Sequence, residues 1–439
     1  MPRVLDVATS YYQILRDNPD YRKLYLGQIV SLLGDWFNFI AVQTLVFELT
    51  HSGLATGLAL ITSTIPAFFL TPVAGSIVDR FDRRKIMIVA DLSRALIALG
   101  MIVVRTPGQI PIIYVLMALL VVFGSFFNPA SSAAIPNLVR RDQLYAANAL
   151  SNSTWGVMLA IGTLAGGVAI GTVGMDAAFV INSLSFLFSA TMLFLIRRSF
   201  GGRSEARRRA LNPFADFGEG LAYAWRRPQI LTLLTVKAGG SLAGGVVLLL
   251  TIYSFEVFKA DSIGIGLLQL ARGVGILLGP ILVAPLVAGR IGRAERVLVL
   301  SFLIAGIGYA LLSAAPALIP GMLAVTFAHV GWGSNWSLSS TLLQRLTPDQ
   351  VRGRIFAMDI GLFTLTSALS TFLTGIATDN FNPRWVAFAL GAVFIIYGIG
   401  WAAVMWSSRR QHPSQWQDGN LNGLELQEEA WATVEQEVR

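Results

Sequence analysis

Length, composition and charge together exclude an ordinary water-soluble protein. The chain has 439 residues, of which 54% are hydrophobic and 13% are charged, about half the charged fraction of a soluble globular domain. It contains no cysteine and only three scattered histidines, which excludes disulfides, iron–sulfur ligation and thiolate zinc sites, and we predict neither a metal nor a cofactor.

The first 23 residues precede the apolar part of the chain. They hold three aspartates and no apolar core, so they are not a cleaved signal peptide. Long apolar runs follow; residues 297–322, for example, carry no charge and exceed the roughly 20 residues that cross a bilayer core. The runs do not alternate in polarity as barrel strands do, so they predict helices. We predict twelve spans, at residues 24–49, 54–78, 86–105, 110–129, 145–171, 175–196, 229–258, 263–288, 297–314, 317–341, 353–378 and 385–406.

The basic residues indicate the orientation of these spans. If the N-terminus is cytoplasmic, 27 of the 33 Lys and Arg residues lie on the cytoplasmic side, three lie on the opposite side and three lie within spans. This asymmetry follows the positive-inside rule. We therefore predict that both termini are cytoplasmic, and that the net charge of +8 does not indicate nucleic-acid binding.

One long connection divides the spans into two sets of six. It opens with a basic run (RRSFGGRSEARRR) and continues with Phe214, Phe217, Leu221 and Trp225 at helical spacing. This pattern predicts an amphipathic helix on the membrane surface, and a solvated linker with stray aromatic residues is the alternative. The predicted parts are a cytoplasmic N-terminal segment (1–23), a six-helix bundle (24–196), the linker (197–228), a second six-helix bundle (229–406) and a polar acidic cytoplasmic tail (407–439).

The two halves repeat each other at a shift of about 208 residues. Phe47-Glu48 closes the first span and Phe255-Glu256 closes the seventh. An Asp-Gln pair precedes both the fifth and the eleventh spans, and the loop GSIVDRFDRRK (75–85) has a degenerate counterpart in VAGRIGRAE (287–295). Parallel repeats of this kind are one building plan of secondary transporters.

Four segments resemble the major facilitator superfamily, in the branch that contains the enterobactin exporter and macrolide efflux permeases. They are DYRKLYLGQIVSLLGD (20–35), GSIVDRFDRRK (75–85), NPASSAAIPNLVRRDQLYAANAL (128–150) and TPDQVRGRIFAM (347–358). The resemblance implies an all-α integral membrane protein in the bacterial inner (plasma) membrane. Its two six-helix bundles would rock about a cavity lined by spans 1, 4, 7 and 10. The chain departs from the drug/proton antiporter pattern, because span 4 has no arginine and span 5 lacks the Gly-Pro signature.

The loop after the second span contains the residues that the resemblance implicates in a conformational switch. In the family, the loop aspartate meets the N-terminus of span 11 when the cytoplasmic side is closed, where the helix dipole favours a carboxylate. The implied switch residues here are Gly75, Asp79, Arg80, Arg83 and Arg84. The alternative for the basic residues is that they only anchor the loop at the membrane surface.

Asp35 is the first candidate for a coupling proton site. It lies about 16 Å into the first span at 1.5 Å per residue, and a lone carboxylate at that depth is expensive and usually functional. With Gln28, Ser31 and Asn38 it forms one polar face of the span, which the resemblance places on the substrate cavity. The alternative is a structural ion pair, with Arg94 or Lys237 as the cation.

The other charges inside the spans have competing interpretations. Arg94 has Asp91 one turn away as a second candidate partner. Lys237 is a candidate for the substrate cavity, where it suits an anionic substrate, or else it extends to the cytoplasmic face. Arg272 and Asp359 are interpreted as structural ion-pair residues of interface helices.

Two equivalent acids and one aromatic face complete the candidates. Glu48 and Glu256 stand near the outer ends of their spans, where they gate or titrate, or are simply tolerated at a helix end. His329 and Trp336 lie along one face of the tenth span. They either contact substrate or serve in packing and interface anchoring.

The leading hypothesis is secondary active transport, namely gradient-driven export of a small amphipathic or hydrophobic compound by a monomeric permease. The expected partners are the small-molecule substrate, membrane lipid and protons as the coupling ion. The chain has no GxxxxGK[ST] phosphate loop and no GxSxG or HExxH motif, so neither ATP hydrolysis nor another enzymatic activity is predicted. The alternative is a lysophospholipid transporter of the same fold, followed by a membrane-embedded enzyme.

Overall fold

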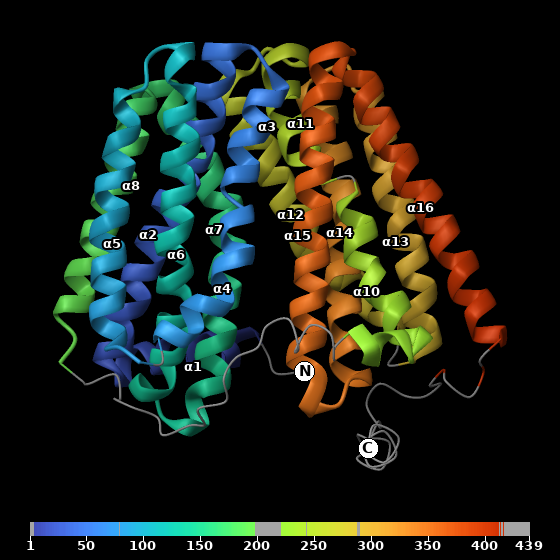
Figure 1. The fold of residues 1–439 in the computed structure, drawn as a ribbon, viewed down its shortest axis with the longest axis horizontal. Helices are drawn as coiled ribbons and strands as arrows, with labels where there is room; N and C mark the ends of the chain where they lie inside the picture. Colours follow the sequence, from blue (N-terminus) through green and yellow to red (C-terminus); the bar gives the residue numbers. More distant parts are fainter. Residues whose placement is uncertain are drawn as a thin grey trace. The chain divides into compact units, whose positions relative to one another are not determined.

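The computed structural model is helical throughout the part of the chain that it describes. These residues are 4–78, 80–197, 221–242, 244–287 and 290–411, with residues 413 and 416, and no β-strand is assigned among them. They separate into two compact units (Figure 1). The first unit comprises Met1–Arg209 and Leu250–Leu270, and the second comprises Ala210–Leu249 and Ala271–Arg439. This division differs from the sequence-based one in joining residues 250–270 to the first unit.

Up to residue 197, the described part of the first unit contains a short N-terminal α-helix followed by seven further α-helices. Its elements are α1 (Val4–Asp17), α2 (Pro19–Thr50), α3 (Gly53–Thr62), α4 (Ile65–Val78), α5 (Arg83–Gly100), α6 (Ile110–Leu138), α7 (Leu144–Val173) and α8 (Met175–Phe194). Helix α8 packs against both α2 and α5, and α5 also packs against α6, as Figure 1 shows for these side-by-side helices. The expected span 54–78 is thus two helices. Side-chain hydroxyls of Ser63 and Thr64 bond back to the Leu60 carbonyl oxygen at the break, a competition that weakens a helix there.

The second unit contains α10 (Pro228–Ser241), α13 (Ile291–Ala314), α14 (Leu318–Leu346), α15 (Asp349–Asn380) and α16 (Pro383–Gln411). The expected seventh span is also interrupted, because α10 ends before α11 (Val246–Ile252) begins and a π-helical turn, Tyr253–Val257, follows. Helix α12 (Asp261–Val287) crosses the boundary between the units. Of the expected linker helix only the end is described, with Leu221 and Trp225 exposed in a short helical segment. The acidic tail lies almost wholly outside the described residues.

Eleven helical segments of the described chain are long and apolar enough to cross a membrane. They cover eleven of the twelve expected spans. The exception is the expected span 317–341, which corresponds to α14. This helix has 29 residues, but its middle carries His329, Asn335 and several serines, and it is not among the eleven.

Local sequence explains several helix boundaries. Proline stands at the first helical position of α2, α10 and α16, where its missing N–H has no partner to lose. Asp82 caps α5 by accepting hydrogen bonds from the backbone N–H groups of Arg84 at 2.9 Å and Lys85 at 3.2 Å. Ser52 caps α3 in the same way, through the Ala55 N–H at 3.1 Å.

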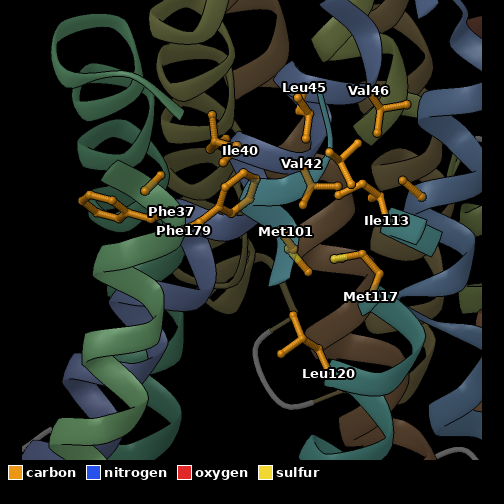
Figure 2. Close-up of a cluster of buried hydrophobic side chains, with 14 of the residues drawn as sticks. Phe37, Ile40, Val42, Leu45, Val46, Met101, Ile113, Met117, Leu120 and Phe179 are labelled. Carbon is orange, nitrogen blue, oxygen red and sulfur yellow. The ribbon is translucent and has the colours of Figure 1, made fainter. Parts of the chain in front are cut away.

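Apolar side chains from several helices build a core in the first unit. Figure 2 shows this cluster, in which α2 contributes Phe37 and Ile40, α6 contributes Ile113 and α8 contributes Phe179, all less than 10% exposed. Since lipid tails are as apolar as these side chains, close packing rather than water exclusion holds such helices together. The core fixes α2 against its neighbours from Phe37 onward, two residues after Asp35.

Candidate functional site

Two charged residues of α5 form a buried ion pair in the first unit. A guanidinium N–H of Arg94 (Nη2) donates to Asp91 Oδ1, and the two residues are 7% and 0% exposed. The guanidinium lies between the rings of Phe127 on α6, at 4.6 Å, and Phe186 on α8, at 4.3 Å. Asp91 Oδ2 and Arg94 Nε have no hydrogen-bond partner in the described structure. The pair is therefore removed from solvent, and part of its hydrogen-bonding capacity is unused.

Asp35 lies on α2 near this pair but is bound to neither member. Arg94 and Asp91 are the charges that act on it, yet Asp35 makes no hydrogen bond or ion pair to any described residue. Its neighbour Gly34 lies so close to α8 that a Cβ there would stand 2.7 Å from Asn182 Oδ1. The absence of a side chain at Gly34 thus lets α2 lie close to α8 at the residue before Asp35. Neither cation that the sequence offered to Asp35 is paired with it.

Two residues of the polar face expected on the first span contact α6. Gln28 Nε2 donates to Ser131 Oγ at 2.5 Å, and Asn38 Nδ2 donates to Met117 Sδ at 3.6 Å. Ser31 Oγ donates to the Gln28 carbonyl oxygen at 3.2 Å. The side-chain amide oxygen of Asn38, Oδ1, is buried without a partner in the described residues. Gln28 and Asn38 thus lie between the helices of spans 1 and 4.

A second buried ion pair joins two helices of the second unit. Lys237 of α10 donates from Nζ to Asp359 Oδ2 of α15, and the two residues are 1% and 0% exposed. The ammonium lies 4.6 Å from the ring centroid of Trp336 on α14 and 5.9 Å from that of Phe356 on α15. Lys237 therefore does not extend to the cytoplasmic face, and Asp359 pairs with Lys237.

His329 and Arg272 belong to a different part of the second unit. The imidazole donates from Nδ1 to the Val325 carbonyl oxygen at 2.9 Å, which leaves Nε2 to accept from the Tyr309 hydroxyl at 3.3 Å. Arg272 lies close enough to His329 and Tyr309 for its charge to act on both. His329 is thus directed at α13, whereas Trp336 of the same helix contacts Lys237.

The repeat-related acids Glu48 and Glu256 are exposed, and their neighbours meet within the first unit. The rings of Phe47 and Phe255 lie 5.0 Å apart. One turn earlier, Thr251 Oγ1 donates to Gln43 Oε1 at 2.5 Å. Both contacts join residues 208 positions apart, so equivalent positions of the two sequence repeats face each other here.

The expected switch loop is only partly described. Asp79 lies outside the described residues, Gly75 is part of α4, and Arg80 is exposed. Arg83 Nη1 donates to the Ala133 carbonyl oxygen at 2.9 Å, and Arg84 donates to the carbonyl oxygens of Leu193, at 2.9 Å through Nε, and Phe194. These bonds tie the start of α5 to the ends of α6 and α8.

Two charged contacts were not anticipated from the sequence. Glu295, 2% exposed, accepts from Arg409 Nη1 at 2.9 Å and from Gln229 Nε2 at 3.4 Å, which joins the ends of α13, α16 and α10. Glu295 is the one acid of an otherwise basic loop, which is a signal that the sequence does carry. In the first unit, Arg105 makes a bidentate bond to Asp176, with both distances 2.8 Å. These hydrogen bonds raise the pKa of the exposed Arg105 above its ordinary value.

Comparison with known proteins gives one consistent family. Residues 10–423 match the family model MFS_3, transmembrane secretion effector. The chain is 28% identical over 412 residues to YfiS of Bacillus subtilis (strain 168), named as an uncharacterized MFS-type transporter, covering 88% of this chain and 93% of YfiS. It is 27% identical over 348 residues to the putative bacilysin exporter BacE of the same strain, covering 77% and 84%.

A third relative and a solved structure agree with this result. Macrolide efflux protein A of Streptococcus pyogenes is 23% identical over 388 residues, which cover 85% of this chain and 92% of that protein. The crystal structure of the nucleoside transporter NupG superposes with a TM-score of 0.66 at 11% identity, covering 88% of this chain and 99% of NupG. At this identity the likeness to NupG shows a shared fold.

Proposed function

This chain belongs to the transmembrane secretion effector family of major facilitator superfamily transporters, and we propose that it exports a small amphipathic or hydrophobic compound across the bacterial inner membrane. The observation that carries the proposal is the match along most of its length to proteins named as exporters and efflux proteins. The buried charges support it, because a protein that only spans a membrane has no need of acids and cations inside its helices.

Transport by alternating access, driven by a proton gradient, is the mechanism that the buried groups support best. Asp35 has no bonded partner among the described residues, so it is free to take up and release a proton. The paired Asp91 and Arg94 beside it fix a positive and a negative charge in the same region. The Asp79 loop is proposed as the switch that stabilises the state closed to the cytoplasm, and the polar face of α2 as part of the substrate cavity.

The transport assay uses inverted membrane vesicles that contain the protein. We expect a radiolabelled macrolide or a small amphipathic peptide to accumulate when a proton gradient is imposed, and a protonophore to abolish the accumulation. Vesicles without the protein are the control. Accumulation that needs ATP in place of a gradient, or movement of a lysophospholipid alone, would contradict the proposal.

For the membrane arrangement we propose that α14 also crosses the membrane, as the tenth of twelve spans in chain order, and that both termini are cytoplasmic. Its 29 residues are ample for a crossing, and His329 in its middle is hydrogen-bonded to the Val325 carbonyl oxygen and to Tyr309. We expect reporter fusions at Gly174 and at Ser204 to report opposite sides of the membrane. A fusion at Ala315 should report the same side as Gly174. Agreement between Gly174 and Ser204 would eliminate this topology.

A further inference from the structure

Three helices of the second unit, α10, α14 and α15, converge on the pair formed by Lys237 and Asp359. Both side chains are almost completely buried. Such a pair is weak evidence for stability, because apolar residues of similar volume often serve a structural role equally well. A structural role alone therefore does not explain why this pair lies in the core of a transporter.

The pair retains unused hydrogen-bonding capacity. An ammonium has three donors, and within the described residues Lys237 donates only to Asp359 Oδ2. Asp359 Oδ1 is buried with no partner there. Among the described residues, Lys237 is also the charge that acts on Asp359. The lysine can thus exchange its carboxylate partner for another without breaking a wider network.

An aromatic cluster lies next to the pair. The ring centroids of Trp332 and Trp336 are 6.1 Å apart, and Phe363 lies 5.1 Å from Trp336 with its ring nearly perpendicular. Trp336 also lies over the Lys237 ammonium and is itself 36% exposed. A Cβ at Gly240 would come within 3.0 Å of Trp332 Cε3, so glycine is what lets the indole lie against α10. The cluster offers flat apolar surface within reach of a cation.

We propose that this cluster binds the substrate as an amphipathic anion, and this inference rests on the proposed transport function. The substrate carboxylate takes the place of Asp359 on Lys237, and the apolar body of the substrate lies on Trp332, Trp336 and Phe363. Charge balance follows if Asp359 takes up one proton as the carboxylate arrives. A cationic substrate fits less well, because it would stand beside Lys237 in a region of low dielectric.

The test measures binding by the purified protein in detergent, with three matched fluorescent probes. Dansylglycine carries a carboxylate, its methyl ester is neutral, and dansylcadaverine carries an amine. We expect the wild-type protein to bind dansylglycine most tightly. Asp359→Asn mimics the protonated carboxyl and frees Lys237. It should tighten dansylglycine binding by about tenfold, the order of one charge-assisted hydrogen bond, with little effect on the ester.

Removing the lysine should abolish the preference for the anion. Each single variant strands one buried charge, Lys237→Gln a carboxylate and Asp359→Asn an ammonium, and can fail to fold for that reason. The decisive variant is therefore the double change Lys237→Gln with Asp359→Asn, which leaves no unpaired charge. It should fold and bind dansylglycine no better than the ester. Asp176→Asn and Lys23→Gln, at exposed or partly exposed ion pairs, are the matched controls and should bind as wild type does.

Three results would overturn the inference: no gain on Asp359→Asn, preference for dansylcadaverine, or unchanged dansylglycine binding by the double variant. If Asp359→Asn is folded, as its melting curve reports, and binds none of the probes, that result counts with the first. The transport assay separates this from failure of the exporter proposal. Gradient-driven macrolide transport without a preference for the anionic probe leaves the exporter standing and removes this site. Selective dansylglycine binding without any gradient-driven transport leaves the anion site standing and removes the exporter proposal.

Discussion

Asp35→Asn is expected to abolish gradient-driven transport while leaving substrate binding and substrate exchange intact. The asparagine mimics the protonated carboxyl, so the coupling proton can no longer be released. Exchange of internal for external substrate needs no net proton movement and should persist. Because Asp35 has no bonded partner among the described residues, its neutralisation strands no cation, and the melting temperature of the purified protein should not fall. The measurements are proton-driven uptake and counterflow in proteoliposomes, with thermal unfolding in detergent.

Asp176→Asn is the matched control, since Asp176 is half exposed outside the core, and it should transport normally. A loss of stability in Asp35→Asn would instead indicate a structural ion pair formed in another state of the protein. Normal gradient-driven transport by a stable Asp35→Asn protein would remove Asp35 from the coupling mechanism. The next candidates would then be Glu48 and Glu256, which are exposed near the meeting point of the two repeats.

The helices could be predicted from the sequence because each apolar run is long enough to cross a bilayer and carries few charges. The apolar runs did not indicate whether each helix is continuous. The interruption after α10 falls in the Gly-rich segment 239–245, and the break between α3 and α4 falls at Ser63 and Thr64. Both breaks involve residues that disfavour a continuous helix, but the length of the apolar run alone does not reveal them. Helix α14 shows the converse, since its polar residues weaken an apolar signal without shortening the helix.

In the candidate site, contacts between residues close in sequence could be predicted, and contacts between distant residues could not. The pairing of Asp91 with Arg94 lies within one helical turn, so the sequence contained it as one of two alternatives. Lys237 and Asp359 are 122 positions apart, and only the packing of α10 against α15 brings them together. The Gln43–Thr251 bond lies between these cases. Gln43 and Thr251 occupy equivalent positions in the 208-residue repeat. The repeat predicted that equivalence, but it did not predict that the two residues are in contact.

Breaking the Asp91–Arg94 pair from one side should destabilise the first unit strongly. Arg94→Gln leaves the Asp91 carboxylate buried without a counter-charge, and Asp91→Asn leaves the guanidinium in the same position between Phe127 and Phe186. The loss of one partner of a buried pair costs about 3–5 kcal/mol. We expect each single variant to show a clearly lowered melting temperature and lower yield of folded protein.

The double variant Asp91→Asn with Arg94→Gln is the decisive measurement, because it removes both charges and strands neither. It should recover most of the stability that each single change loses, so that the double-mutant cycle shows strong coupling. The exposed pair of Arg105 and Asp176 is the control, and its members should show little coupling because solvent screens them. If the losses of Asp91→Asn and Arg94→Gln simply add, the two charges do not stabilise each other in the folded protein. The Asp91–Arg94 pair could then not supply the fixed charges beside Asp35.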